Sequence, residues 1–104
     1  MSKEKSSYNT IKKDGRLEVI FSGRMETVFV EAEIDKILAE IAGCEGDVTL
    51  NLEQVDYISS SFLRLCISAA KNLKAKDQKL MVIKIQPAVK KVFKIAGLEA
   101  MISS

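Results

Sequence analysis

The spacing of hydrophobic residues changes repeatedly along this chain, and these changes constrain the fold more than any other feature. Between Val30 and Ile41 apolar residues recur at steps of three and four, which places them on one face of a helix. Between Val48 and Leu52 they occupy every second position, which is the period of a strand. A chain of 104 residues in which the two periods alternate indicates one α/β domain with a single core, spanning residues 1–104.

The beginning of the chain predicts a β-hairpin. Residues 8–13 and 16–22 are β-prone runs, and the Asp14-Gly15 pair between them favours a type I′ turn. The polar residues 1–7 that precede the hairpin are expected to form a flexible N-terminus.

The rest of the chain predicts helices that alternate with strands. We expect Thr27 to cap a helix that Gly43 ends in a left-handed conformation. Strands joined by helices form right-handed crossovers, so the N-terminal hairpin should lead into a mixed, mostly parallel sheet of four to five strands with three to four helices. The later elements are a strand over 47–52, a helix from within Ser59–Ser61 to about 75, a strand over 80–85, a helix over 87–96 that starts at Pro87 and ends at Gly97, and a short closing element over 98–102.

The composition excludes most small enzymes. No histidine occurs, which removes Ser-His and Cys-His nucleophile pairs and imidazole metal ligands. The five glycines are scattered, so there is no Gly-rich phosphate loop. Nearby carboxylates such as Glu53 and Asp56 have no neighbouring His or Cys ligand, and we interpret them as loop acids. We therefore predict that the protein is not an enzyme and has no metal site and no cofactor.

Charge and hydropathy indicate where the protein acts. A formal net charge of +2 gives no reason to expect nucleic acid as a partner. The two cysteines, Cys44 and Cys66, are too few for a disulfide framework and fit a reducing compartment. The N-terminus lacks the apolar core of a signal peptide, and no apolar run approaches the roughly 20 residues that cross a bilayer. We expect a soluble, cytoplasmic protein that does not insert into membranes.

Three consecutive serines, Ser59, Ser60 and Ser61, lie between a predicted strand and a mostly apolar helix. In one interpretation they only cap the free N–H groups of the first helical turn, and spacing alone favours this interpretation. In the other, one serine accepts a phosphate, which adds about −1.5 to −2 charges and is held by those N–H groups. Such a charge would release a partner packed over the start of the helix, particularly over Phe62.

The serines belong to a longer segment that resembles a known family. Residues 50–63 read LNLEQVDYISSSFL and are similar to the signature of STAS domains, the family of sulphate-transporter and anti-sigma-factor-antagonist domains. The resemblance covers about residues 8–102, and the STAS fold that it implies agrees with the predicted order of strands. A second matching block consists of the strand at 79–82 followed by Pro87, Val89, Val92, Phe93, Ala96, Gly97 and Leu98.

The resemblance implies a function. Single-domain STAS proteins of this size are typically anti-sigma-factor antagonists, which are binding modules that regulate transcription through a partner. Such an antagonist binds an anti-sigma serine kinase, a GHKL-type ATPase, and thereby displaces the sigma factor. The kinase phosphorylates a serine at the helix start and releases the antagonist, and a PP2C-type phosphatase resets it.

The resemblance also implies site residues. The family pattern here is Asp-Ser-Ser-Gly, or Ser-Ser-Ala-Gly in many bacterial members. Aligned on Leu63, the acceptor falls on Ser60, while Ser59 takes the Asp position and Phe62 the Gly position. Ser59 and Ser61 are the alternative acceptors. The implied contact surface for the partner consists of Asp56, Tyr57, Ile58, Ser59, Phe62 and Leu63.

Two other hypotheses stand beside this one. A STAS protein can be a non-phosphorylated regulatory or structural subunit, docked on the ATPase of a lipid ABC transporter or inside a sensory complex, with Phe62 as a permanent anchor. A small enzyme or nucleotide-binding protein is the third hypothesis, and the lack of histidine, phosphate loop and metal cluster counts against it.

Overall fold

The computed structural model describes residues 5–103, which form one four-stranded sheet, three α-helices and a short 3-10 helix. Residues 1–4 of the N-terminus that we expect to be flexible lie outside the described residues. The strands are β1 (Ser7–Lys13), β2 (Arg16–Met25), β3 (Val48–Ile58) and β4 (Leu80–Ile83). The helices are α1 (Thr27–Ala42), α2 (Ser60–Lys74), α3 (Pro87–Ile95) and the 3-10 helix η1 (Glu99–Met101).

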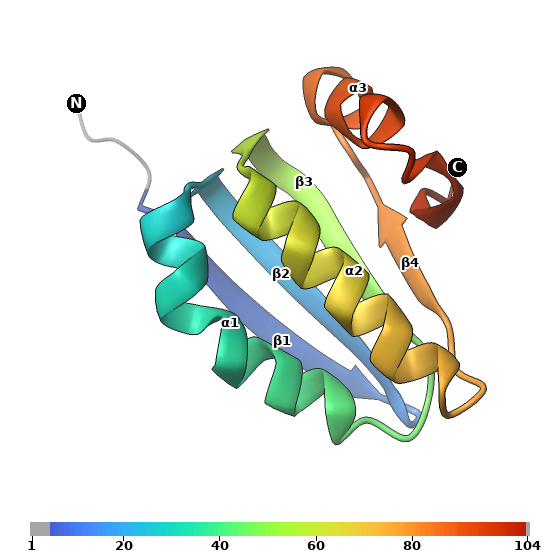
Figure 1. The fold of residues 1–104 in the computed structure, drawn as a ribbon. Coiled ribbons are helices and arrows are strands. Elements are labelled where there is room, and N and C mark those ends of the chain that lie inside the picture. The colour runs from blue at the N-terminus through green and yellow to red at the C-terminus, as the bar shows by residue number, and fades with distance from the viewer. Residues whose placement is uncertain (1–4, 104) are drawn as a thin grey trace.

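The sheet has the strand order β1-β2-β3-β4. β1 and β2 are antiparallel, whereas β2 with β3 and β3 with β4 are parallel. α1 joins β2 to β3 and α2 joins β3 to β4, and Figure 1 shows both helices on the same face of the sheet. Two successive right-handed crossovers in one direction require this arrangement. The predicted fold class, a hairpin that leads into a mixed and mostly parallel sheet, is confirmed.

The hairpin turn has the predicted geometry. Asp14 has a φ of 52° and Gly15 a φ of 78°. Positive φ at both central residues is the requirement of a type I′ turn, whose twist matches that of the flanking strands. The turn sets the register in which Lys13 pairs with Arg16 and Tyr8 with Phe21.

The predicted caps of the first helix are wrong. Thr27 is the first helical residue, and the residue before it, Glu26, makes no side-chain capping bond. Gly43 has a φ of −80°, so it is right-handed. The chain leaves α1 through a further turn in which the Cys44 N–H donates to the Ile41 carbonyl at 3.1 Å, and no left-handed residue is needed there.

The predicted end of the last helix at Gly97 is confirmed. Gly97 has a φ of 77° and donates its N–H to the Lys94 carbonyl at 3.1 Å. The next residue, Leu98, donates to the Phe93 carbonyl at 2.8 Å. These two bonds form a Schellman motif, in which a left-handed glycine satisfies the last carbonyls of a helix.

Two strands differ in length from the prediction. β3 continues to Ile58 instead of ending at 52, because it contains two irregularities at which its register against β2 shifts. Each shift adds a residue to β3, breaks the two-residue period and conceals the strand in the sequence. The interpretation of Glu53 and Asp56 as loop acids is therefore wrong, because both lie within β3. β4 ends at Ile83 rather than 85, because Lys84 takes a left-handed φ of 55°.

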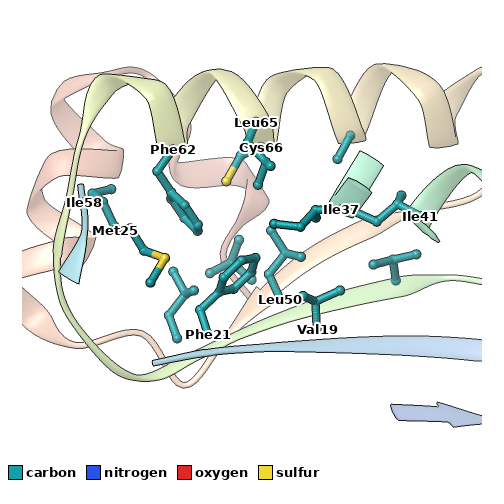
Figure 2. Packing of buried hydrophobic residues seen from close by; sticks show 14 of the residues in the cluster. Val19, Phe21, Met25, Ile37, Ile41, Leu50, Ile58, Phe62, Leu65 and Cys66 are labelled. Carbon is teal, nitrogen blue, oxygen red and sulfur yellow. The ribbon is translucent and has the colours of Figure 1, made fainter. Parts of the chain in front are cut away.

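The first turn of α2 is held on the sheet by the Phe62 ring. Phe62 is 0% exposed, and its ring meets that of Phe21 edge-on at a centroid distance of 5.0 Å (Figure 2). This T-shaped arrangement is a favourable one for two aromatic rings. The expectation that Phe62 lies on a partner surface is thus wrong: the ring points into the core.

We predict that Phe62→Ala lowers the free energy of unfolding by about 3–5 kcal/mol, because a buried ring is lost and a cavity remains. Urea denaturation followed by circular dichroism measures the change. Ile95, which is 82% exposed on α3, supplies the control, and Ile95→Ala should change stability by less than about 0.5 kcal/mol. Equal urea midpoints for the two variants would contradict the anchoring role of Phe62.

Candidate functional site

The candidate site lies where β2 and β3 end and α1 and α2 begin (Figure 1). The Ser59 N–H donates to the Met25 carbonyl at 3.0 Å, which ties the start of α2 to the last residue of β2. In a parallel sheet the carboxyl ends of strands and the N-termini of the following helices share one edge. Residues from four elements therefore meet around the three serines.

The structure gives the three serine hydroxyls different environments. Ser59 is the N-cap, 7% exposed, and its Oγ accepts a bond from the Phe62 N–H at 3.3 Å. Ser61 is 2% exposed, and its Oγ donates to Oε2 of Glu31 on α1 at 3.4 Å. Ser60, the first residue of α2, is exposed. Among the three, Ser60 alone presents its side chain to the surroundings.

The predicted contact residues around the serines separate into exposed and buried ones. Asp56 is exposed and Tyr57 is 39% exposed, so both present side chains at the end of β3. Leu63 is half-buried. Ile58 is 6% exposed and belongs to the core cluster, as Phe62 does. Asp56, Tyr57 and Leu63 are thus accessible near the junction of β3 and α2 that contains Ser60, whereas Ile58 and Phe62 are not.

A cation–π contact orders the β2–β3 edge of the site. The Arg24 guanidinium lies 4.3 Å from the centre of the Tyr57 ring. Its Nε also donates to Oε2 of Glu26 at 2.9 Å, and this hydrogen bond raises the pKa of Arg24 above its usual value. Arg24 is therefore a permanently charged group with two partners.

Sequence reasoning missed Val28, which is 84% exposed in the first turn of α1. Its side chain is an exposed apolar group near the end of the molecule at which α1 begins. A signal was present, because Val28 falls outside the helical stripe that includes Val30 and Ile41. Figure 1 shows the starts of α1 and α2 side by side at this end of the molecule.

The surroundings of the serines contain no reactive thiol. Cys66, one turn after Phe62, is fully buried, and burial raises the pKa of its thiol to about 12. A thiol with this pKa is protonated at neutral pH and a poor nucleophile.

Across residues 5–103 no three His, Cys, Asp or Glu side chains are grouped as a metal ion would require. None of the helices in that part of the chain is long and apolar enough to span a bilayer.

A family model described as the STAS domain matches residues 8–103. The chain belongs to the STAS domain family. In sequence, it is 33% identical over 84 residues to BtrV of Bordetella bronchiseptica, which is described as an anti-sigma factor antagonist; the match covers 81% of this chain and 72% of BtrV. It is 28% identical over 92 residues to the anti-sigma-B factor antagonist of Staphylococcus aureus, covering 86% of this chain and 83% of that protein.

Solved structures share the STAS fold of this chain. The anti-sigma factor antagonist SpoIIAA in its unphosphorylated form superposes with a TM-score of 0.83 at 21% identity, covering 93% of this chain and 86% of SpoIIAA. The phosphorylated form of Bacillus SpoIIAA superposes with a TM-score of 0.75 at 20% identity, covering 93% and 89%. At these identities the similarity shows the fold alone, and this fold is the STAS fold that the sequence resemblance implied.

The different environments of the serines predict different effects on stability. Ser59→Ala removes the N-cap acceptor of α2 and should lower the free energy of unfolding by about 1 kcal/mol. Ser60→Ala removes an exposed hydroxyl and should change it by less than about 0.5 kcal/mol. Urea denaturation of the two variants in parallel measures both. A larger loss for Ser60→Ala than for Ser59→Ala would contradict the assignment of the cap.

Proposed function

We propose that this protein is an anti-sigma-factor antagonist, a binding module without catalytic activity that engages an anti-sigma serine kinase and is released when Ser60 is phosphorylated. The observation that carries the proposal is the exposure of Ser60 at the start of α2, next to two serines that are buried. Membership of the STAS family and the names of the relatives in Bordetella and Staphylococcus support it.

The position of Ser60 suits a reversible phosphate. Its γ-phosphoryl donor would be the ATP of a GHKL-type kinase: the ester bond to Ser60 Oγ forms, the bond to ADP breaks, and the hydroxyl proton is lost. Apart from the Phe62 N–H, which Ser59 caps, the first N–H groups of α2 have no acceptor within the helix, so together with the helix dipole they accommodate the new charge. The antagonist therefore stays folded, while a kinase packed over this surface meets a dianion. A PP2C-type phosphatase would reverse the step.

The proposed contact surface follows from exposure. It contains Asp56, Tyr57 and Leu63, and Val28 is added to it from α1. Ile58 and Phe62 are left out because both lie in the core. The buried Ser59 caps α2 and contributes little area to the proposed contact surface. The proposal places the protein in the cytoplasm, where sigma factors act.

The alternative role as a permanent subunit of a transporter or sensory complex loses its main support. That role relied on Phe62 as an anchor in a pocket of the partner, and Phe62 is 0% exposed. Burial of this ring explains instead why a large residue is accepted near the helix start: it fills the core beside Phe21.

Phosphorylation of Ser60 is tested by mass spectrometry of the protein from growing and stressed cells. Trypsin releases residues 37–64 as one peptide that contains all three serines, and fragmentation locates the phosphate. We expect a phosphate on Ser60 whose occupancy changes with condition. A peptide that stays unmodified in every condition would overturn the proposed switch and favour the constitutive subunit.

Negative charge at position 60 should weaken binding to the kinase. We predict that Ser60→Asp weakens the affinity by about tenfold or more, because an uncompensated charge in an interface costs at least about 1.4 kcal/mol. Isothermal titration calorimetry with the kinase measures it. Asn72→Asp, an exposed position near the other end of α2, adds the same charge and should leave the affinity unchanged. Equal affinities of the two variants would count against the proposed function.

The apolar contact at Val28 gives a second test of the surface. Val28→Glu should weaken kinase binding by about tenfold, because a carboxylate would lose its water without gaining a partner. Ile95, which is 82% exposed on α3 against 84% for Val28, is the matched control, and Ile95→Glu should bind as the unmodified protein does. Thermal unfolding of both variants checks that the fold is kept. Unchanged affinity of a folded Val28→Glu would remove α1 from the proposed surface.

A further inference from the structure

We infer that Arg64 binds the phosphate of modified Ser60 within the same molecule, and that it turns away from Glu31 to do so. The inference rests on the proposed function, because it concerns how that same site responds to phosphorylation. It identifies an arginine of this chain as the group that holds the switched state.

The helix places the two side chains together. Ser60 and Arg64 are four residues apart within α2, so they occupy neighbouring positions on successive turns. Side chains with this spacing have Cβ atoms about 5–6 Å apart and form ion pairs on helix surfaces. Both are exposed, the Arg64 side chain by 63%, so nothing needs to move but the long arginine side chain itself.

Arg64 is the loosely held cation of the site. Its Nη1 lies 3.9 Å from Oε2 of Glu31, near the limit of an ion pair, and the side chain of Glu31 is itself 57% exposed. Exposed pairs of this kind contribute little because water and salt screen them. Arg24 differs, because it is hydrogen-bonded to Glu26 at 2.9 Å and lies over the Tyr57 ring. Of the two arginines, Arg64 is free to change partner.

A phosphate is a better partner for Arg64 than the Glu31 carboxylate. It carries about −1.5 to −2 charges and several acceptor oxygens, which the planar guanidinium can bind with two parallel bonds. Glu31 would keep the hydrogen bond from the buried Ser61 hydroxyl, at 3.4 Å. Phosphorylation would then change the surface twice: it adds the phosphate, and it withdraws Arg64 from the carboxylate on α1.

The test uses the full chain with phosphoserine installed at position 60 during translation. Phosphorus NMR follows the titration of the phosphate from monoanion to dianion. A neighbouring cation favours the dianion and lowers this pKa, so Arg64→Gln should raise it by roughly 0.3 pH unit or more toward the free value of about 6. Arg64→Lys should keep most of the lowering, since the charge remains.

Two control variants make the result specific. Lys71→Gln removes one positive charge from the far half of α2 and should leave the phosphate pKa unchanged. Arg24→Gln removes the other arginine of the site and should have a smaller effect than Arg64→Gln. A phosphate pKa that is the same in Arg64→Gln and Lys71→Gln would overturn the inference, as would a larger shift in Arg24→Gln than in Arg64→Gln.

Failure of this inference is distinguishable from failure of the proposed function. The installed phosphoserine reports on Arg64 whether or not a cellular kinase modifies Ser60. A peptide over 37–64 that is never phosphorylated in cells would overturn the proposed function alone. An unchanged titration in Arg64→Gln, together with a regulated phosphate in cells, would overturn the arginine's role alone.

Discussion

The packing of the Phe62 ring against Phe21 determines the orientation of α2, and the candidate site depends on that orientation. With Phe62 pointing into the core, a residue two positions earlier lies about 200° round the helix axis and faces outward. That residue is Ser60. Arg64 comes two positions after Phe62, so it lies about 200° from Phe62 in the opposite direction of rotation. Ser60 and Arg64 are therefore within about 40° of each other around the helix axis. One buried ring thus turns both polar side chains toward the surface.

The three serines differ in burial and hydrogen bonding because of the same helix orientation. Ser59 bonds to the first turn of α2, and Ser61 bonds across to Glu31 on α1. Both hydroxyls are used by the fold and both are buried, so they stabilise the position of the helix start. Ser60 is exposed, and its hydroxyl is not among the side-chain hydrogen bonds of the described residues. The structure assigns the capping role to Ser59. The regulatory role that we propose for Ser60 is therefore no longer an alternative to capping, because the two roles concern different serines.

Local signals predicted much of the fold. The Asp14-Gly15 turn and the Gly97 helix end were predictable because each depends on a few neighbouring residues and a positive φ. The length of β3 was not, since its register shifts depend on pairing with β2 and break the alternation that marks a strand. The caps at Thr27 and Gly43 failed for a related reason: residue type indicates what a position allows, whereas the surrounding chain decides what it adopts.

The sequence by itself determined the order of the elements, because hydrophobic period and turn residues act over a few positions. It also contained the segment 50–63, whose resemblance to the STAS signature indicated the family and the serines that could accept a phosphate. Only the tertiary structure decided that Ser60 is the exposed serine, that Phe62 is core, and that Val28 is exposed in the first turn of α1. These facts depend on which side of α2 meets the sheet and on how α1 starts next to α2. Contacts between segments far apart in the chain set both, and a one-dimensional pattern does not contain them.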